Sequence, residues 1–359
     1  MKKRIGILFG GKSAEHEVSI RSAINVASAL DLERFEPVPI YIDKQGEWLY
    51  VPTVESVLES TYESKNVSLS LGTSKSGDSL EADLLNHVDV IFPVLHGPLG
   101  EDGSVQGLFN LIEVPFVGPG ILSSAVGMDK DVAKRLLRDS GITVARFRVI
   151  SATEFASTNA EEIVQELGLP MFVKPANMGS SVGVSKVDTL EAFNSAAKEA
   201  LRFDTKIVIE EAIVGAEIEC AVLGNETPKA SVIGKIVPQT DDFYSYDAKY
   251  IDMGGATLEL PALISEEATK NAQELAIKVY KVLGCEGMTR VDMFLRDDNT
   301  IVVNEINTIP GFTNISMYPK LWEASGVSYT ELTTTLIDLA IERFEVRRNL
   351  ETSYETTEV

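Results

Sequence analysis

The segment FVKPANMGSSVG, residues 172–183, decides the fold because it joins a buried strand to a loop of small polar residues. The apolar pair Phe172-Val173 ends in Lys174, and the loop Gly179–Gly183 follows almost at once. Glycines let a backbone approach a ligand closely, and serines add hydroxyl donors, so this loop can cover a polyphosphate. Taken alone, such a loop is more often a plain turn, and the interpretation depends on what the rest of the chain supplies.

A later segment supplies acidic partners for the lysine and the loop. The sequences RVD (290–292) and NEIN (304–307) lie on the two strands of a hairpin expected over 289–306. Alternation places Arg290 and Asp292 on one face, and likewise Glu305 and Asn307, and these faces can converge across an antiparallel pair. Carboxylate and amide oxygens are suitable Mg²⁺ ligands. A solvated strand face with an ion pair is the alternative, but with the upstream lysine and loop the set makes a complete magnesium-nucleotide site.

The rest of the chain divides into three expected domains. Residues 1–118 alternate strands and helices and predict an α/β domain with a parallel sheet. Residues 119–211 have the size of a small α+β domain, and residues 212–359 form a C-terminal α+β domain. The polar, tyrosine-rich stretch 238–258 is long enough to be a functional lid or a disordered segment. A serine-rich insertion at 53–80 receives no function.

The N-terminus contains a phosphate-loop pattern that we reject. Residues 6–13 match GxxxxGK[ST], but almost no chain precedes the first glycine, and the supposed loop contains an apolar run. The better interpretation makes Ile5–Phe9 a strand and Gly10-Gly11 the turn after its carboxyl end, where open parallel sheets bind ligands. Glu15 and Ser19, four residues apart at the start of a helix, can then meet a small zwitterion.

Composition excludes several classes of protein. The chain has 359 residues, 54 acidic against 32 basic, and a net charge of −22, so general binding of nucleic acid or an anionic membrane surface is excluded. Two distant cysteines make neither a disulfide framework nor a zinc site. No stretch approaches the ~18 apolar residues of a membrane span. We expect a cytoplasmic protein without membrane insertion.

The ordered motifs resemble those of the D-alanine–D-alanine ligase family of the ATP-grasp superfamily, from Ile5 to about Ser328. They are GGKSAEHEVS (10–19), LHG (95–97) with GEDG (100–103), MDK (128–130), KP (174–175) with GSSVG (179–183), AKY (248–250), RVD (290–292), and NEINT (304–308) with PG (310–311). The resemblance implies an α/β ATP-grasp fold with a pre-ATP-grasp N-terminal domain. It also implies ATP-dependent joining of two D-alanines through a D-alanyl phosphate, for peptidoglycan precursor synthesis. At 238–258 it favours the lid over a disordered segment.

The resemblance assigns roles residue by residue. It implies catalytic roles for Glu15, Ser180, Tyr250 and Arg290; D-alanine contacts for His96, Gly311, Ser316 and Met317, with Ser19 added from its place beside Glu15; ATP contacts for Lys130, Lys174, Ser181, Glu210, Glu217 and Lys249; and Mg²⁺ binding by Asp292, Glu305 and Asn307. Glu15 would bind the first ammonium and His96 would lie near the first carboxylate. Glu210 and Glu217 would hold adenine and ribose. Tyr250 would hydrogen-bond Ser180.

Alternatives remain open on the same fold. Family members that make D-alanyl-D-lactate often carry Phe at the position of Tyr250, so this tyrosine favours D-alanine as second substrate. D-alanyl-D-lactate or D-alanyl-D-serine ligation is the alternative activity, and a non-catalytic nucleotide-binding regulator is the alternative class. The family also implies two Mg²⁺ ions, replaceable by Mn²⁺, and a homodimer formed through the N-terminal domain.

Overall fold

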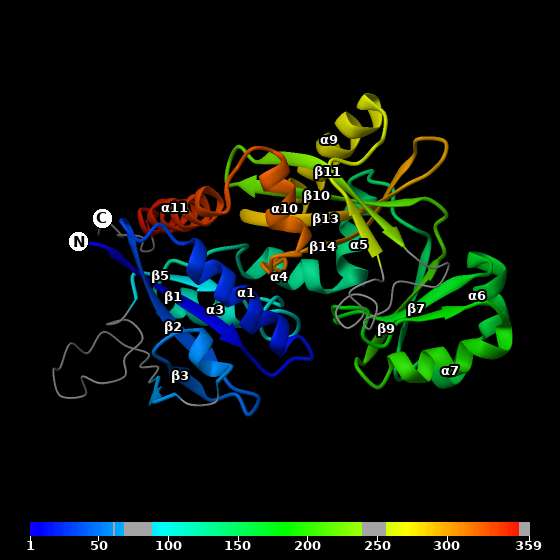
Figure 1. The fold of residues 1–359 in the computed structure, drawn as a ribbon. Helices are drawn as coiled ribbons and strands as arrows, with labels where there is room; N and C mark the ends of the chain where they lie inside the picture. Colours follow the sequence, from blue (N-terminus) through cyan, green and yellow to red (C-terminus); the bar gives the residue numbers. More distant parts are fainter. Residues whose placement is uncertain (60–61, 68–87, 239–255, 352–359) are drawn as a thin grey trace, which may run out of the picture.

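Three β-sheets organise the chain (Figure 1). The structure is a computed structural model and describes residues 1–59, 62–67, 88–238 and 256–351. Much of the insertion expected at 53–80 and most of the lid expected at 238–258 lie outside these residues. The mixed α/β architecture confirms the predicted fold class.

The N-terminal sheet has the order β4-β3-β2-β1-β5. Its elements are β1 (Lys3–Gly10), α1 (His16–Ala29), β2 (Phe35–Ile42), β3 (Trp48–Tyr50), β4 (Lys65–Asn66), β5 (Val90–Pro93) and α3 (Ser104–Leu111), with a 3₁₀ turn at Glu55–Val57. The expected parallel pairing is confirmed for β2-β1-β5, whereas β3 and β4 pair antiparallel at the edge. A short connection after β2 forms a hairpin and cannot make a parallel crossover.

The central sheet has the order β6-β9-β7-β8 and is antiparallel throughout. Its elements are β6 (Phe147–Ser151), α6 (Ala160–Leu167), β7 (Met171–Pro175), β8 (Ser185–Val187), α7 (Leu190–Ala200) and β9 (Lys206–Glu211), with a 3₁₀ turn at Phe155–Ser157. The valines at 182, 184 and 187 predict a strand over residues 182–187, but only its second half, β8, forms one. Gly183 has φ +70°, which breaks an extended strand and continues the glycine-serine loop.

The C-terminal sheet has the order β12-β11-β10-β13-β14, again antiparallel. The remaining elements are α4 (Ile121–Met128), α5 (Lys130–Asp139), β10 (Ala216–Gly224), β11 (Lys229–Pro238), β12 (Ala256–Glu259), α9 (Glu266–Val282), β13 (Gly287–Leu295), β14 (Ile301–Asn307), α10 (Met317–Ala324) and α11 (Tyr329–Arg348). The predicted hairpin is confirmed as β13-β14, with Asp292 opposite Glu305 and Arg290 opposite Asn307.

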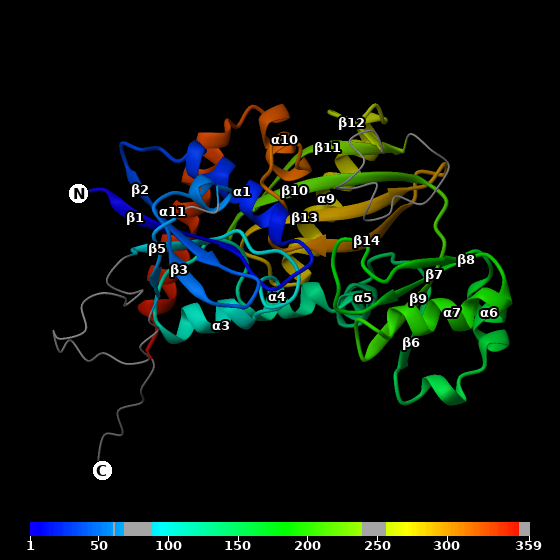
Figure 2. The same ribbon diagram turned by 60° about the horizontal axis from the view of Figure 1, so that its bottom comes forward.

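The apolar cores show how these sheets are joined. One core combines both ends of the chain: Ile7 and Phe92 from the N-terminal sheet pack with Tyr318 of α10 and Leu336 of α11. Figure 2 shows α11 running beside β1 and β5. The central sheet and its helices α6 and α7 instead form a separate core. Helices α4 and α5 pack on the C-terminal sheet, so the domain boundaries at 118 and 211 stay a prediction.

Arg343 of α11 ties the C-terminal helix to the end of the N-terminal region. Its buried guanidinium donates hydrogen bonds to the carbonyls of Gly118 and Phe116 and lies 4.5 Å from the Phe116 ring centroid. Burial lowers the pKa of Arg343 to about 10, and Glu286 opposes that shift. The two carbonyls have a strong donor in a place that water does not reach.

Replacing Arg343 with methionine is therefore expected to lower the free energy of unfolding by about 2–4 kcal/mol, because two buried carbonyls lose a charged donor. Urea denaturation followed by circular dichroism measures this change. Arg347→Met is the matched control, since Arg347 is 46% exposed and pairs with the same Glu286. That control should change stability by no more than about 1 kcal/mol. Equal effects of both substitutions would contradict the anchoring role.

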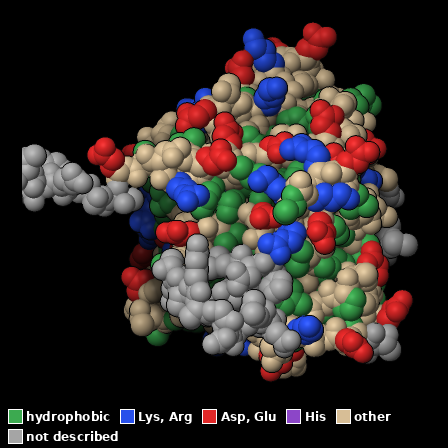
Figure 3. Space-filling view, turned by 90° about the vertical axis from the view of Figure 1, so that its left-hand side faces the viewer, with side chains coloured by type: hydrophobic (Ala, Val, Ile, Leu, Met, Phe, Trp, Pro, Cys, Tyr) green, Lys and Arg blue, Asp and Glu red, His purple; other side chains and the backbone are tan. Residues whose placement is uncertain are grey.

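The described surface carries mixed charge. On the face in Figure 3, acidic and basic side chains are interspersed and form no large patch of one sign. Among the helices that the structure describes, none combines the length and apolarity needed to cross a bilayer.

Candidate active site

A pocket of about 330 Å³ lies between the central and C-terminal sheets. Its lining includes five residues expected to contact ATP, namely Lys130, Lys174, Ser181, Glu210 and Glu217, together with the expected metal ligand Glu305. Apolar side chains, among them Phe172 and Phe294, form its other wall. Cations and carboxylates that are far apart in sequence therefore converge on one cavity with an apolar side, which suits a nucleotide.

Two buried lysines share one carboxylate beneath this pocket. Glu210 lies 2.9 Å from the Lys174 ammonium and 3.2 Å from that of Lys134. Burial alone would raise the pKa of Glu210, but the two lysines hold it below its ordinary value. Burial also lowers the pKa of Lys134, whereas Glu210 keeps that of Lys174 above its ordinary value. The Glu210 side chain thus orients two cations and also lines the pocket, so its contact with adenine or ribose stays a prediction.

Lys130 lies at the start of α5, facing the same cavity. Its ammonium donates to the Met178 carbonyl at 2.7 Å and lies 3.5 Å from a Glu305 oxygen. The helix begins here because the Asp129 side chain accepts hydrogen bonds from the amides of residues 131 and 132. Lys130 therefore connects the glycine-serine loop with the carboxylate on β14.

The glycine-serine loop reaches across to the N-terminal domain. Ser180 and Ser181 adopt φ values of +50° and +59°, which non-glycine residues rarely adopt outside functional sites. The Ser180 hydroxyl donates a hydrogen bond to the Glu15 carboxylate, which lies at the start of α1 and is 8% exposed. Residues separated by more than 160 positions thus meet at one point. This hydrogen bond joins the glycine-serine loop of the nucleotide pocket to the segment that follows β1.

His96 lies beside Glu15, after β5. Its Nδ1 faces the Ile309 carbonyl at 3.0 Å, so Nδ1 carries the proton. Burial lowers the pKa of His96, while Glu15 opposes that shift. Nε2 has no hydrogen-bond partner among the described residues, and in this neutral form it accepts a hydrogen bond. The sequence analysis expected His96 to lie near the carboxylate of the first substrate, and to donate a hydrogen bond to it through Nε2, His96 must take up a second proton.

Ser19 does not face the site. It is fully buried, accepts a hydrogen bond from the Gly10 amide at 2.8 Å, and donates to the Val94 carbonyl. The hydroxyl therefore joins the ends of β1 and β5. The predicted contact between Ser19 and a zwitterion is wrong. Ser19 lies one helical turn after Glu15, and its side chain points to the ends of β1 and β5 and not to the site.

Glu101 received no role in the sequence analysis, yet it is central here. Its two carboxyl oxygens accept the amides of Gly97 at 2.7 Å and Ile309 at 3.1 Å. Burial, with the nearby Glu15 adding to it, raises the pKa of Glu101 to about 8. Together, His96 and Glu101 hold both backbone polar groups of Ile309, just before Gly311.

Replacing Glu101 with glutamine is expected to remove one of these two acceptors and lower kcat/KM for D-alanine about tenfold or more. Stability supplies a second readout. A raised pKa in the folded state makes wild-type stability fall as pH rises from about 4.5 to about 8. The variant lacks this fall, so the wild-type advantage in unfolding free energy should shrink between pH 5 and pH 8. Parallel pH dependences in denaturant titrations would contradict a buried, protonated Glu101.

Arg290 is held between two buried carboxylates. Its Nε lies 2.7 Å from Asp292 and 2.8 Å from Glu219, and its Nη2 donates to the second Asp292 oxygen at 2.7 Å. Both acids are 4% exposed. The Asn307 amide also donates to Asp292, at 2.8 Å. The guanidinium is thereby fixed in orientation on the hairpin face that also carries Glu305.

The segment after β14 brings Gly311, Ser316 and Met317 together. A Cβ at Gly311 would lie 2.7 Å from the Ser316 hydroxyl oxygen, so a side chain at 311 would not fit. That hydroxyl already accepts from the Thr313 amide at 2.9 Å, and Met317 is the first residue of α10. Amides at a helix start favour a carboxylate. The two remaining predicted residues, Lys249 and Tyr250, lie outside the described residues.

Comparisons with known proteins agree with this geometry. Residues 4–119 match the family model "D-ala D-ala ligase N-terminus", and residues 136–338 match "D-ala D-ala ligase C-terminus". The chain is similar to a D-alanine–D-alanine ligase of Oceanobacillus iheyensis, at 52% identity over 98% of this chain and 99% of the relative. The chain therefore belongs to the D-alanine–D-alanine ligase family. D-alanine–D-alanine ligase A of Escherichia coli K12 is 49% identical over 98% of this chain and 99% of that protein.

Two solved structures of this ligase family and its relatives share the fold. The D-alanine–D-alanine ligase from Coxiella burnetii superposes with a TM-score of 0.85, at 40% identity over 97% of this chain and 96% of that one. The VanG D-Ala:D-Ser ligase from Enterococcus faecalis also has a TM-score of 0.85, at 37% identity over 95% of this chain and 100% of that one. These matches confirm the ATP-grasp fold predicted for the chain.

The donor set of the ligase site fits a magnesium ion. Among the described residues, no three Asp, Glu, His or Cys side chains cluster as a metal site would require, but the expected set is two carboxylates and an amide. Asp292 and Glu305 lie directly opposite each other on β13 and β14. Arg290 pairs with Asp292, and Lys130 pairs with Glu305. The carboxylate oxygens of both acids therefore already face a positive charge. Carboxylate and amide oxygens are the ligands of a hard divalent cation.

The sequence analysis did not predict three residues of the ligase site: Glu101, Lys134 and Glu219. Weak indications existed for each. Glu101 lies in the quoted motif GEDG, Lys134 follows Lys130 by one helical turn, and Glu219 alternates with Glu217 on β10. None of these patterns distinguishes a buried partner from a solvated side chain.

Proposed function

We propose that the protein joins two D-alanines into D-alanyl-D-alanine at the expense of ATP, with a divalent metal, to make a peptidoglycan precursor. One observation carries the proposal most directly. The Glu15–Ser180 hydrogen bond places the end of the N-terminal sheet against the glycine-serine loop of a lysine-lined nucleotide pocket. A small amino acid held near Glu15 then lies next to the phosphates that Lys130 and Lys174 would bind.

The chemistry explains why such an arrangement is needed. A carboxylate resists attack by an amine, because its negative charge repels the nucleophile and oxide is a poor leaving group. Transfer of the γ-phosphoryl group of ATP to one carboxylate oxygen forms D-alanyl phosphate and ADP. The amine of the second D-alanine attacks the acyl carbon, and the tetrahedral intermediate expels phosphate. The protein contributes positioning and neutralisation of charge.

Side chains divide this work by position. The Glu15 carboxylate accepts the ammonium of the first D-alanine, while the Ser180 hydroxyl holds the Glu15 carboxylate in place. Arg290 presents a planar cation to the transferring oxygens and the tetrahedral oxyanion, and the Gly311 amide adds a neutral donor. Ser316 and the Met317 amide receive the carboxylate of the second D-alanine at the start of α10. By the family resemblance, Lys249 would contact the γ-phosphate and Tyr250 would hydrogen-bond Ser180, and both residues lie outside the described part of the chain.

Asp292, Glu305 and Asn307 would hold two Mg²⁺ ions, with Mn²⁺ able to substitute, and Glu305 would serve both. When bound, the metal supplies positive charge to the triphosphate oxygens. These three residues keep three oxygen donors on one face of the β13-β14 hairpin. The Lys134 ammonium also donates a hydrogen bond to the Asn304 carbonyl of β14, at 3.2 Å.

Purified protein should release ADP and phosphate only when ATP, Mg²⁺ and D-alanine are all present, with D-alanyl-D-alanine as the product. Mass spectrometry of the product and a coupled ADP assay measure this directly. Tight ATP binding without turnover would instead support the regulator alternative. Replacement of D-alanine by L-alanine is the matched control and should give no product.

D-alanyl-D-serine ligation is the second candidate, because the VanG D-Ala:D-Ser ligase shares the fold at 37% identity. A panel of D-alanine, D-serine and D-lactate as second substrates, each against [¹⁴C]D-alanine, separates these activities. We expect D-alanyl-D-alanine to exceed the other products at equal concentrations. A dominant D-alanyl-D-serine product would reverse the assignment of second substrate.

We also propose a cytoplasmic homodimer formed through the N-terminal domain. Leu111 on α3 and Leu122 on α4 are 73% and 72% exposed, and the two helices are neighbours. Sedimentation of the wild type and of Leu111→Asp tests this, since a charge at a dimer interface should yield monomer.

A further inference from the structure

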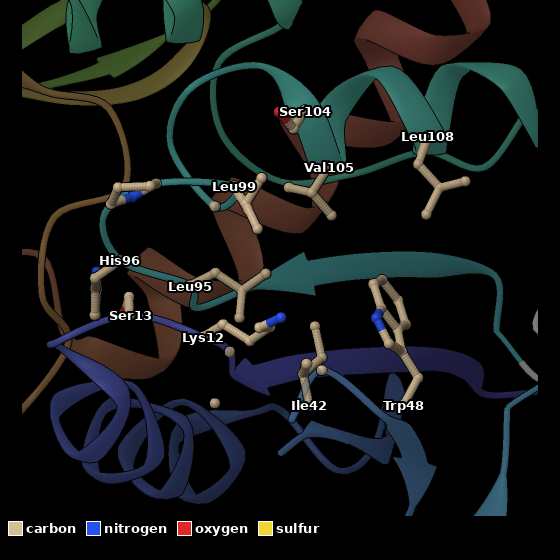
Figure 4. Close-up of a pocket in the computed structure, with 15 residues that line it drawn as sticks. Lys12, Ser13, Ile42, Trp48, Leu95, His96, Leu99, Ser104, Val105 and Leu108 are labelled. Atoms are coloured by element: carbon tan, nitrogen blue, oxygen red, sulfur yellow. The ribbon is translucent and has the colours of Figure 1, made fainter. Parts of the chain in front are cut away.

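A second cavity, of about 220 Å³, lies on the N-terminal sheet beside the proposed D-alanine site but outside it (Figure 4). It opens where the parallel strands β1, β2 and β5 reach their carboxyl ends, at Gly10, Ile42 and Leu95. Open parallel sheets bind ligands at this edge. The cavity includes His96 and Ser13 at one end, but neither Glu15 nor Arg290 lines it.

The walls of the cavity are apolar. Six side chains make most of them: Ile42, Trp48, Leu95, Leu99, Val105 and Leu108. Ile42, Leu95 and Val105 are buried, whereas Leu99 is 57% exposed and forms part of the rim. The volume is below the roughly 300–1,000 Å³ of pockets for drug-sized ligands, so a fragment-sized molecule fits.

One cation lies along these apolar walls at the open side of the cavity: Lys12, which lines the pocket and is itself exposed. Figure 4 shows the Lys12 side chain passing between Leu95 and Ile42 toward Trp48. Gly46 makes this path possible, because a Cβ there would lie 2.8 Å from Lys12 Cδ. In the described part of the chain, no carboxylate oxygen lies within 4.0 Å of the Lys12 ammonium. The nearby Lys44 differs, since its ammonium is 2.6 Å from Glu17.

The lining also excludes the substrates. Among its described residues there is no Asp or Glu, so the ammonium of a zwitterionic amino acid would have no partner here. A single lysine is too little charge for a triphosphate. A lone cation beside apolar walls instead matches one negative charge on an apolar body.

We propose that this pocket binds a small apolar monocarboxylate, of the arylalkyl or branched-alkyl class, with its carboxylate on Lys12 and its body against Trp48. His96 and Trp48 lie at opposite ends of the pocket in Figure 4, so an occupant against Trp48 leaves the His96 end free, and we expect it and the ligase substrates to bind at the same time.

Phenylacetate and its neutral amide, phenylacetamide, form a matched pair of probes. Trp48 lines the pocket whereas Trp322 is buried in the core, so tryptophan fluorescence reports binding and Trp48→Phe should remove the change. We expect phenylacetate to bind at least about tenfold tighter than phenylacetamide. Lys12→Met should abolish that preference, and Lys44→Met should retain it.

Three results would overturn the proposal: equal affinities of acid and amide for the wild type, an unchanged acid affinity in Lys12→Met, or displacement of phenylacetate by saturating ATP and D-alanine. ADP release by each variant in the absence of probe is measured in parallel and should match the wild type. Loss of ligase activity in the wild type would count against the proposed function and not against this pocket, because the fluorescence readout needs no turnover.

Discussion

Replacing Arg290 with methionine is expected to lower kcat for D-alanyl-D-alanine formation at least about 10³-fold. The guanidinium is held by Asp292 and Glu219 and is the cation that faces the developing oxyanion in the proposed mechanism. A single oxyanion donor contributes about 10²–10³ in kcat in other enzymes, and Arg290 also neutralises the transferring phosphoryl group. Initial rates at saturating ATP and D-alanine measure the loss.

Structural damage must be separated from this effect, because removal of Arg290 leaves two buried carboxylates unpaired. Arg290→Lys is the matched variant: it keeps a charge but loses the planar fork that meets Asp292 at two atoms. We expect Arg290→Lys to approach wild-type thermal stability while remaining at least about tenfold slower. A lysine variant with full turnover would show that orientation of the cation is unimportant.

Glu305→Gln is expected to reduce turnover below detection, about 10³-fold or more, with little change in fold. Glutamine has nearly the same shape, but it removes the charge that lies opposite Asp292 and 3.5 Å from Lys130. The proposed metal site then loses its shared ligand. Rates measured across a wide range of Mg²⁺ and Mn²⁺ concentrations test this.

Glu274→Gln is the control for Glu305→Gln, since Glu274 is 66% exposed on α9, away from the pocket. It should retain wild-type rates at every metal concentration. Full activity of Glu305→Gln at ordinary Mg²⁺ would remove Glu305 from the metal site, whereas partial recovery at high Mg²⁺ would support it.

Sequence reasoning was most successful where chemistry follows from local periodicity. The strands β13 and β14 have a period of two, which predicts that Arg290 shares a face with Asp292 and Glu305 shares one with Asn307. The register of the hairpin then brings these two pairs onto the same face. The same reasoning failed for Ser19, because helical spacing gives a shared face without saying which face meets the sheet. It also extended a strand into residues 182–184, where the positive φ of Gly183 cannot be inferred from valine and glycine content.

The missing parts of the site depend on tertiary contacts. Glu101 is a solvated acid by sequence, and only the approach of Ile309, more than 200 residues away, makes it a buried acceptor. Glu210 likewise gains two buried partners, Lys134 and Lys174, and the first of them depends on the approach of α5 to β9. Neither change has a local pattern that would predict it.

The distribution of apolar cores bears on how nucleotide could enter. The first and last parts of the chain are fused into one block by a common interior, which α11 completes, so neither part could turn independently. Residues of the central sheet have an interior of their own. That unit is joined to the block through residues 140–146 and 212–215, and α5 holds it through the Lys134–Glu210 ion pair and the Lys130–Met178 hydrogen bond. Opening the seam above Lys130 by a rigid rotation of this unit must therefore break these contacts, whereas deletion of the chain from Tyr329 onward would unfold the block and leave the interior of the central unit intact.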